Sequence, residues 1–268
     1  MIISSRKNQT VARSRGLINE KKLREKESLI ALEGEKLCVE ALRAGLKAEY
    51  ALFSEEAEKK FPQTVKTLSE VCPTYIVTDE VYSYISGQKT PQGIFLAAKL
   101  LDKSENLDRI IEKEKIILLD GIQDPGNLGT IIRTAEAFGI GGMILSGDCA
   151  DPYSPKALRA SMGSALRLTP FCAEDTLSGA LTKLKKAGFA LYAAMLDKTA
   201  KKLGEFSFPK KTALIIGNEG HGISQSAAEQ CEKLYIPIQT AESLNAAAAA
   251  AVFCYEMSHN LKKTKDLP

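Results

Sequence analysis

From residue 116 onward the sequence alternates short apolar runs with stretches of helical period. The apolar runs span residues 117–120, 143–146, 166–171, 189–196, 213–217 and 234–238. Strands that are separated by helices form a mostly parallel sheet with helices on both faces. We therefore predict an α/β domain over residues 106–268, with ligands bound beyond the carboxyl ends of its strands.

The first hundred residues carry a second, smaller pattern of the same kind. Strand-like runs alternate there with helical patterns; the strands are predicted at 29–32, 50–53, 74–77 and 93–98, and helices at 35–44 and 65–71. The densely charged segment 101–115 separates this part from the next apolar run. Because 268 residues suffice for two domains, we predict a smaller α/β domain over residues 1–105.

Composition and residue usage exclude several classes of protein. Hydrophobic residues make up 44% and charged residues 26% of the chain, which argues against wholesale disorder and fibrous repeats. The longest apolar run, 246–255, is half of the roughly 20 residues that span a bilayer, and no apolar signal segment precedes the basic N-terminus. We expect a cytoplasmic protein with no membrane span.

The cysteines and histidines do not form a metal-binding pattern. Six cysteines lie far apart without a C-x-x-C pair, and the chain holds only two histidines. We expect reduced thiols that pack as small hydrophobic groups, and no metal ion.

Positive charge is concentrated at the N-terminus. Residues 1–26 contain eight lysines and arginines against two glutamates, although the whole chain has a net charge of only +3. Arg6, Lys7, Arg13 and Arg15 are therefore candidates for binding phosphates. A frayed, solvated basic helix is the alternative that charge alone leaves open.

Three polar, glycine-rich loops follow predicted strands, whereas the common nucleotide motifs are absent. There is no G-x-x-x-x-G-K-[ST] motif, and Gly139-Ile140-Gly141 is not continued as G-x-G-x-x-G. No G-x-S-x-G or H-E-x-x-H motif occurs either. The three loops span residues 120–133, 214–223 and 236–245.

Each loop has an ordinary structural interpretation. Asn127 suits a helix cap, and Arg133, six residues later, could share a helix face with it or pair with Glu136 on the surface. The glycines of 217–222 could simply form a tight turn. Ser243 or Asn245 could cap the alanine-rich helix that follows.

Together, however, the loops resemble a known family. The pattern N-x-G-x-x-x-R at 127–133, IIGNEGHGI at 215–223 and IPIQTAESLN at 236–245 are similar, in order and spacing, to the three motifs of the SpoU, or TrmH-like, branch of the SPOUT RNA 2′-O-ribose methyltransferases. The segment 154–163 also resembles that family. The stretches 31–42 and 85–97 resemble its RNA-substrate-binding domain. One departure is visible, because many relatives continue after Asn245 with Val-Ser-Val where this chain has alanines.

The resemblance implies a fold, a cofactor and a substrate. It implies a trefoil knot in the C-terminal domain, S-adenosyl-L-methionine as cofactor, and a homodimer through that domain with the active site completed across the interface. It implies methylation of a ribose 2′-hydroxyl, most often in ribosomal RNA, whereas the smaller transfer-RNA relatives usually lack the N-terminal domain. The alternatives are a transfer-RNA 2′-O-methyltransferase and a non-catalytic RNA-binding protein.

The resemblance also implies site residues. The catalytic set would be Arg133, Asn127, Glu219, Ser243 and Asn245. The cofactor-binding set would be Gly217, Asn218, Gly220, Ile236, Ile238 and Leu244. A free guanidinium has a pKa far above the neutral range, so we interpret Arg133 as a cation that holds the adjacent phosphate and lowers the pKa of the hydroxyl, not as a base.

Overall fold

The computed structural model describes residues 2–99, 106–168, 170–172, 176–205, 207–239 and 243–259. The chain divides into two compact units, Met1–Leu101 with Tyr153–Arg167, and Asp102–Pro152 with Leu168–Pro268. The predicted domain boundary between residues 105 and 106 falls at the edge of a gap in the described residues and stays a prediction.

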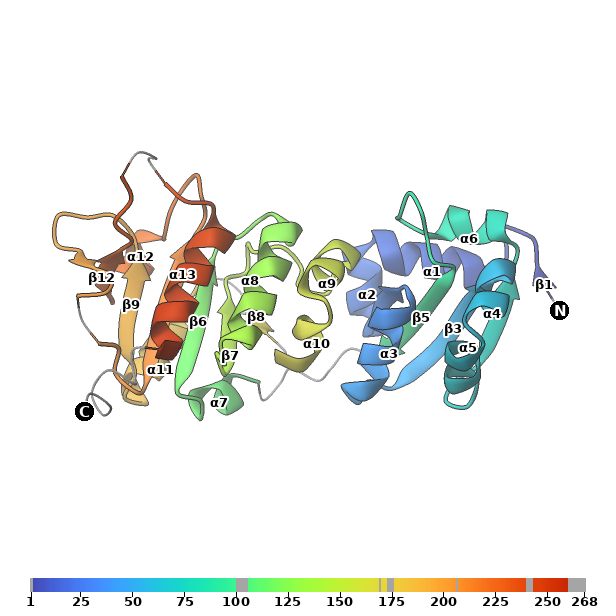
Figure 1. Cartoon of the computed structure of the whole chain (residues 1–268), viewed down its shortest axis with the longest axis horizontal. Coiled ribbons are helices and arrows are strands. Elements are labelled where there is room, and N and C mark those ends of the chain that lie inside the picture. Colours follow the sequence, from blue (N-terminus) through green and yellow to red (C-terminus); the bar gives the residue numbers. More distant parts are fainter. Residues whose placement is uncertain are drawn as a thin grey trace. The chain divides into compact units, whose positions relative to one another are not determined.

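The first unit is built on a five-stranded mixed sheet (Figure 1). Its strand order is β1 (Ile2–Ile3), β4 (Thr74–Val77), β3 (Ala48–Ser54), β5 (Ile94–Lys99) and β2 (Leu29–Glu33). Strand β5 runs antiparallel to both of its neighbours, and the other pairs are parallel. The helices are α1 (Gln9–Asn19), α2 (Lys21–Glu27), α3 (Glu35–Arg43), α4 (Glu55–Lys60), α5 (Pro62–Ser69), α6 (Asp79–Ile85), α9 (Pro155–Ser161) and α10 (Ser164–Leu168).

The basic N-terminal helix α1 is anchored, not frayed. Asn8 caps it by accepting hydrogen bonds from the backbone of Thr10 and Val11. Val11 and Leu17 are fully buried in the same core as the inner residues of the sheet. The apolar face of α1 therefore fixes which of its basic side chains point outward.

The second unit contains a seven-stranded sheet in which every pair is parallel, as predicted. Its order is β10 (Lys201–Lys202), β12 (Glu232–Tyr235), β9 (Ala190–Ala194), β11 (Thr212–Gly217), β6 (Lys115–Asp120), β7 (Gly142–Leu145) and β8 (Phe171–Cys172). The helices are α7 (Asn106–Ile111), α8 (Pro125–Ala137), α11 (Ser178–Lys186), α12 (Gln225–Ala228) and α13 (Ala246–His259). Strand order does not define the threading of a chain, so the knot stays a prediction.

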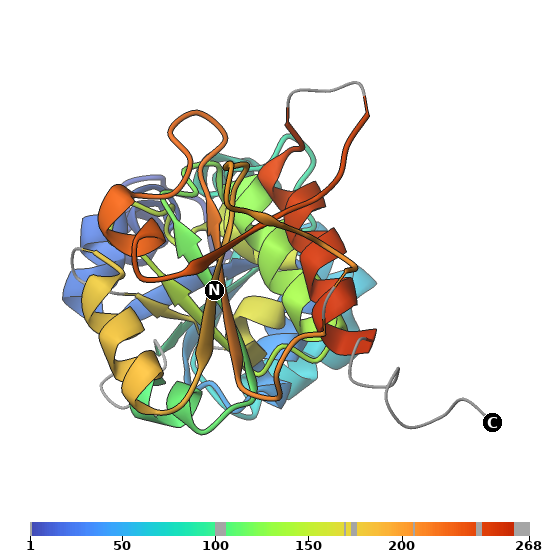
Figure 2. The same ribbon diagram turned by 90° about the vertical axis from the view of Figure 1, so that its left-hand side faces the viewer.

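Helices cover both faces of this sheet, which confirms the predicted fold class (Figure 2). Side chains alternate between the faces of a strand: Ile116 and Leu118 of β6 lie in one core with α11, where Leu181 is fully buried. On the other face α8 and α13 pack against each other, and α13 also contacts β11. Burial on both sides explains why these strands read as continuous apolar runs.

Two predicted strands were wrong in part. Residues 166–168 of the run 166–171 belong to helix α10, and only Phe171–Cys172 pair as β8. A short apolar run does not distinguish a strand from a buried helical turn. The last strand ends at Tyr235 instead of Ile238, because Pro237 has no N–H to donate to a ladder.

Candidate active site

Side chains from the three predicted loops meet beyond the carboxyl ends of β6 and β11. Asn127 lies in the first turn of α8, Glu219 follows β11, and Asn245 directly precedes α13. The Nδ2 atom of Asn127 donates to Glu219 Oε1 at 2.8 Å. The Nδ2 atom of Asn245 donates to Asn127 Oδ1 at 3.2 Å and to Glu219 Oε1 at 3.1 Å. We name these three residues the Asn–Glu–Asn cluster.

Two of the three loops meet because their strands are neighbours, and Asn245 of the third loop lies at the start of α13, which packs against α8. Strands β6 and β11 pair in parallel with Asp120 opposite Gly217, so the loops after them leave the sheet at the same edge. The backbone N–H of Ala246 also donates to Glu219 Oε1, at 3.2 Å. One carboxylate oxygen therefore receives three donors, which hold the Glu219 side chain in place.

Asn245 has both of the roles that its sequence position allowed. Its Oδ1 atom accepts from the backbone of Ala247 at 2.9 Å and of Ala248 at 3.3 Å, which is a helix cap. Its Nδ2 atom meanwhile belongs to the Asn–Glu–Asn cluster. The predicted cap at Asn127 was wrong: Asp124 caps α8 by accepting from the Asn127 backbone N–H, which leaves the Asn127 side chain free for the cluster.

The loop after β11 is a closed turn held by Asn218. The backbones of Asn218 and Gly222 exchange two hydrogen bonds, at 3.1 and 2.9 Å. The Asn218 side chain donates to the Gly121 carbonyl and accepts from the Gly220 N–H, both at 2.7 Å. At Gly217 a Cβ atom would lie 2.4 Å from the backbone of Gly222, so only glycine fits there.

Asp120 is a positioning residue that the sequence analysis missed. Its Oδ2 atom accepts from the backbone N–H and the hydroxyl of Ser224, at 2.8 and 2.7 Å, and so fixes the far end of the loop after β11. Its position at the end of a predicted buried strand was the available signal.

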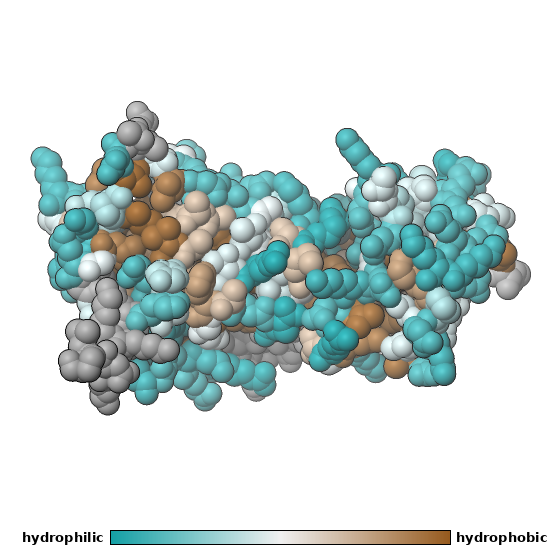
Figure 3. Space-filling view, viewed as in Figure 1, coloured by the Kyte–Doolittle hydropathy of each residue, from teal (hydrophilic) through white to brown (hydrophobic). Residues whose placement is uncertain are grey.

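The third loop carries an apolar surface next to α13. Ile236 and Leu244 are half-buried, and Ile238 is 38% exposed; Figure 3 shows apolar side chains gathered beside α13. Ser243 is exposed and makes no hydrogen bond to another described residue. Residues 240–242 of this motif lie outside the described part of the chain.

Arg133 lies on the exposed face of α8, apart from the Asn–Glu–Asn cluster. Thr130, Arg133 and Ala137 form the exposed stripe of the helix, whereas Asn127 is half-buried and turned toward Glu219. Six residues along a helix correspond to about 600° of rotation, roughly 120° short of two full turns. The side chains of Asn127 and Arg133 therefore do not share a face. Within the described residues no carboxylate pairs with Arg133, so the alternative of a surface ion pair with Glu136 is wrong.

The four basic residues proposed to bind RNA have different surroundings. Arg13 donates to Glu27 at 2.7 Å and stacks over Tyr50, 5.2 Å from the ring centroid; burial raises the pKa of Tyr50 to about 12. Arg15 donates to the Tyr84 carbonyl and stacks over its ring.

The other two basic residues are more accessible. Arg6 forms an exposed ion pair with Glu80 at 2.6 Å. The Lys7 ammonium is exposed and has no partner among the described residues. The side chains of Arg6 and Lys7 can therefore bind a phosphate at a small cost in free energy, because an exposed ion pair contributes little.

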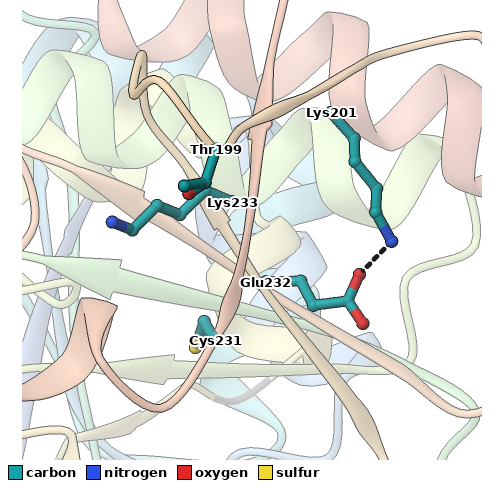
Figure 4. A pocket seen from close by; sticks show the side chains of 5 residues that line it. All are labelled: Thr199, Lys201, Cys231, Glu232 and Lys233. Atoms are coloured by element: carbon teal, nitrogen blue, oxygen red, sulfur yellow. Dashed lines mark hydrogen bonds and ion pairs between the residues drawn. The ribbon is translucent and has the colours of Figure 1, made fainter.

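A hollow of about 190 Å³ at the β10–β12 edge of the second sheet is unrelated to the motifs (Figure 4). It is lined by Thr199, Lys201, Cys231, Glu232 and Lys233. Lys201 pairs with Glu232 at 2.7 Å and Lys233 with Asp197 at 3.0 Å, so both ammonium groups are already neutralised. Burial raises the pKa of Cys231 to about 11, which keeps this thiol protonated and unreactive at neutral pH.

The described residues contain neither a metal-binding cluster nor a membrane-spanning helix. No three histidine, cysteine, aspartate or glutamate side chains there are grouped so that they could hold a metal ion. No described helix combines the length and apolar character that crossing a bilayer requires. The expectation that no metal takes part stays a prediction.

Comparisons with known proteins match nearly the whole chain. Residues 114–255 match the SpoU rRNA methylase family, and residues 8–96 match the MRM3-like substrate binding domain. The 23S rRNA (guanosine(2553)-2′-O)-methyltransferase RlmP of Bacillus subtilis (strain 168) is 32% identical over 95% of this chain and 98% of its own length.

Solved structures agree with the sequence matches. An AdoMet-bound rRNA methyltransferase from Sinorhizobium meliloti aligns with a TM-score of 0.84 and 29% identity, over 96% of this chain and 97% of its own. The SpoU methyltransferase AviRb from Streptomyces viridochromogenes, in complex with AdoMet, aligns with a TM-score of 0.83 and 25% identity, over 94% and 97%.

Proposed function

The chain belongs to the SpoU rRNA methylase family, and on that premise we propose that it methylates a ribose 2′-hydroxyl of ribosomal RNA with S-adenosyl-L-methionine as donor. The predicted family, enzyme class and cofactor are thereby confirmed. The observation that carries the proposal is the Asn–Glu–Asn cluster, in which the three motif loops are joined at one sheet edge.

The residues after β11 and β12 fit the cofactor. The turn at Gly217 closes on the Gly222 backbone with no space for a Cβ atom, which fixes the shape of the loop. Gly217, Asn218 and Gly220 would offer backbone donors and acceptors, and Ile236, Ile238 and Leu244 an apolar wall. When bound, S-adenosyl-L-methionine supplies an electrophilic methyl group on a sulfonium that loses its charge as the methyl leaves, which an apolar wall favours.

The remaining residues act on the RNA. The guanidinium of Arg133 would hold the phosphate beside the target ribose and stabilise negative charge that develops on the 2′-oxygen. The hydroxyl proton then passes to a phosphate oxygen or to water. Asn127, Glu219, Asn245 and Ser243 would orient the ribose, because displacement at carbon demands an aligned approach of the reacting atoms.

Methyl transfer and its RNA substrate can be tested together. Purified protein, labelled S-adenosyl-L-methionine and either ribosomal or transfer RNA should give label only in ribosomal RNA, at a nucleotide whose 3′ linkage resists nuclease and alkali. Label in transfer RNA alone would support the transfer-RNA alternative. RNA binding without any transfer would identify a non-catalytic binding protein.

The N-terminal basic residues would supply RNA affinity. A cation that has no partner among the described residues, such as Lys7, and a cation that already has protein partners, such as Arg13, should give different results when replaced by alanine. Lys7→Ala should flatten the dependence of log affinity on log salt by roughly 0.7 to 0.9, one phosphate contact, without lowering the melting temperature. Arg13→Ala should instead cost about 1 kcal/mol of stability with the salt slope unchanged, because this side chain is occupied by Glu27 and Tyr50. Filter binding from 50 to 300 mM salt, with thermal unfolding, measures both; equal slopes for Lys7→Ala and wild type would contradict the assignment.

We further propose a homodimer through α8 and α13, in the cytoplasm where the relatives' ribosomal substrates are made. Support comes from the exposed face of α13, which presents Ala248, Val252, Tyr255 and His259 at helical spacing. Tyr255 is 49% exposed and packs its ring edge against Phe138. Such a face of small and apolar residues allows close helix approach and, in a dimer, would bring Arg133 of α8 near the interface.

Tyr255→Asp should therefore convert the protein to a monomer in sedimentation at micromolar concentration, because an unpaired carboxylate would be buried in the interface. Tyr75→Asp, at a tyrosine of the first unit that is 38% exposed, is the matched control and should leave the mass unchanged. A wild-type monomer with full activity would refute the dimer.

A further inference from the structure

The segment Tyr153–Arg167 lies between strands β7 and β8 of the second sheet but packs with the first unit. Its helix α9 contacts β2, and Arg159 of α9 faces Glu33, the last residue of β2. Arg159 Nη1 is 3.8 Å from Glu33 Oε2, and the Glu33 side chain is only 1% exposed. The buried carboxylate of β2 thus receives its counter-charge from a residue 126 positions later in the chain.

The hydrogen bonds of this carboxylate are incomplete. Glu33 Oε1 accepts from the Ser86 hydroxyl at 2.5 Å. Glu33 Oε2 and Arg159 Nη1 are both buried and have no hydrogen-bond partner among the described residues. Charge-assisted N–H···O bonds are about 2.7 to 2.9 Å long, so these two atoms attract each other as charges at a separation roughly 1 Å longer. Buried polar groups left in this way are uncommon and call for an explanation.

Glu33 is also fixed to the loop at residues 86–93. The Ser86 hydroxyl that donates to Glu33 accepts from the Gln88 backbone N–H at 3.1 Å, so it holds the start of the loop. At the other end, Gln92 Oε1 accepts from the Glu35 N–H at 3.0 Å in the first turn of α3. Between them Lys89 is exposed, with no partner among the described residues. Loop 86–93 is therefore held at both ends, at its start through Ser86 and Glu33, and it exposes the ammonium of Lys89.

We propose that Arg159 and Glu33 are a positioning pair for methyl transfer. Through Glu33 the pair links loop 86–93 to the segment Tyr153–Arg167. In that loop Lys89 would bind an RNA phosphate. The segment continues along the chain into β7 on one side and β8 on the other, so the pair fixes where the chain of the second unit leaves the first. Neither residue touches the reacting atoms, so both act through the position of the RNA; the inference rests on the proposed function.

Arg159→Met tests the pair by single-turnover kinetics at saturating RNA and cofactor. The transfer rate should fall at least about tenfold, since misplacement by about 1 Å can cost up to a hundredfold. Dissociation constants for S-adenosylhomocysteine and for RNA should stay within about twofold. Arg159→Lys keeps the charge opposite Glu33 and should recover most of the rate, because the pair is held by charge at 3.8 Å and not by a two-pronged hydrogen bond.

Arg159→Met leaves the buried Glu33 carboxylate without a counter-charge, which can destabilise the fold. A double variant is therefore measured beside the single one. Glu33→Gln with Arg159→Met removes both charges and should restore the melting temperature, because replacing both partners costs far less than removing one. The transfer rate should remain low. A double variant as fast as wild type would overturn the proposal and leave the pair a purely structural feature.

A second readout does not need activity. In hydrogen exchange the amides of residues 86–93 and 153–167 should exchange faster in the double variant, together and ahead of the rest of the first unit. Lys21→Met is the matched control: its ammonium lies 3.7 Å from Glu25 in the same unit but is 56% exposed, and it should change neither exchange nor rate. Wild-type protein that methylates no RNA would refute the proposed function and this inference with it. Equal rates and equal exchange for the double variant and an active wild type would refute the inference alone.

Discussion

Arg133→Ala should slow methyl transfer by at least about a hundredfold while changing affinity for S-adenosylhomocysteine by less than about twofold. The loss is of the size expected when one preorganised group that stabilises developing charge is removed. Cofactor affinity should persist because Arg133 lies on the exposed face of α8, away from the turn at Gly217. Single-turnover kinetics and calorimetric titration measure the two quantities separately.

Arg133→Lys is the informative companion to the alanine variant. It should recover little of the rate, because an ammonium is a point charge and cannot hold a phosphate and a hydroxyl with one planar fork. Stability should hardly change in either variant, since no described carboxylate pairs with Arg133. A fast Arg133→Ala enzyme would remove this residue from the catalytic set.

Gly217→Ala should weaken binding of S-adenosylhomocysteine by roughly tenfold to a hundredfold. The new Cβ atom would lie 2.4 Å from the carbonyl carbon and oxygen of Gly222, which are backbone atoms and cannot turn aside. Relieving this overlap costs about 1 to 3 kcal/mol, and the turn that holds Asn218 and Glu219 must shift. The Asn–Glu–Asn cluster should then loosen, so the transfer rate should also fall.

Gly179→Ala serves as the control for that variant. Gly179 lies in α11 of the same unit, and a Cβ atom there meets nothing within 4 Å. Alanine is the better helix former, so stability should stay equal or rise by up to about 1 kcal/mol. Unchanged calorimetric affinity in Gly217→Ala would mean that the turn after β11 does not contact the cofactor.

Local patterns in the sequence were sufficient for the elements and for the set of candidate residues. Burial on both faces makes a parallel strand a continuous apolar run, so β6, β9 and β11 could be located from hydropathy alone. Weak signals failed where the local pattern was ambiguous. The run 166–171 is too short to distinguish a helical turn from a strand, and the acidic cap at Asp124 competes with Asn127 within four residues.

Which side chains meet was decided by the tertiary structure. Asn127 bonds to Glu219 across 92 positions because β11 lies beside β6 in the sheet, out of sequence order, and to Asn245 across 118 positions because α13 packs against α8. No local pattern encodes that neighbour, because strand order results from the packing of segments that are distant in the chain. The same holds for Arg13, whose charge is taken up by Glu27, and for Arg159, which folds onto Glu33 from between two strands of the other unit. The sequence by itself determined the types of element and the chemistry of the loops, since period and residue type are local properties. The structure determined which cations are free for RNA and which carboxylate holds the motif loops together, since burial and pairing depend on the whole chain.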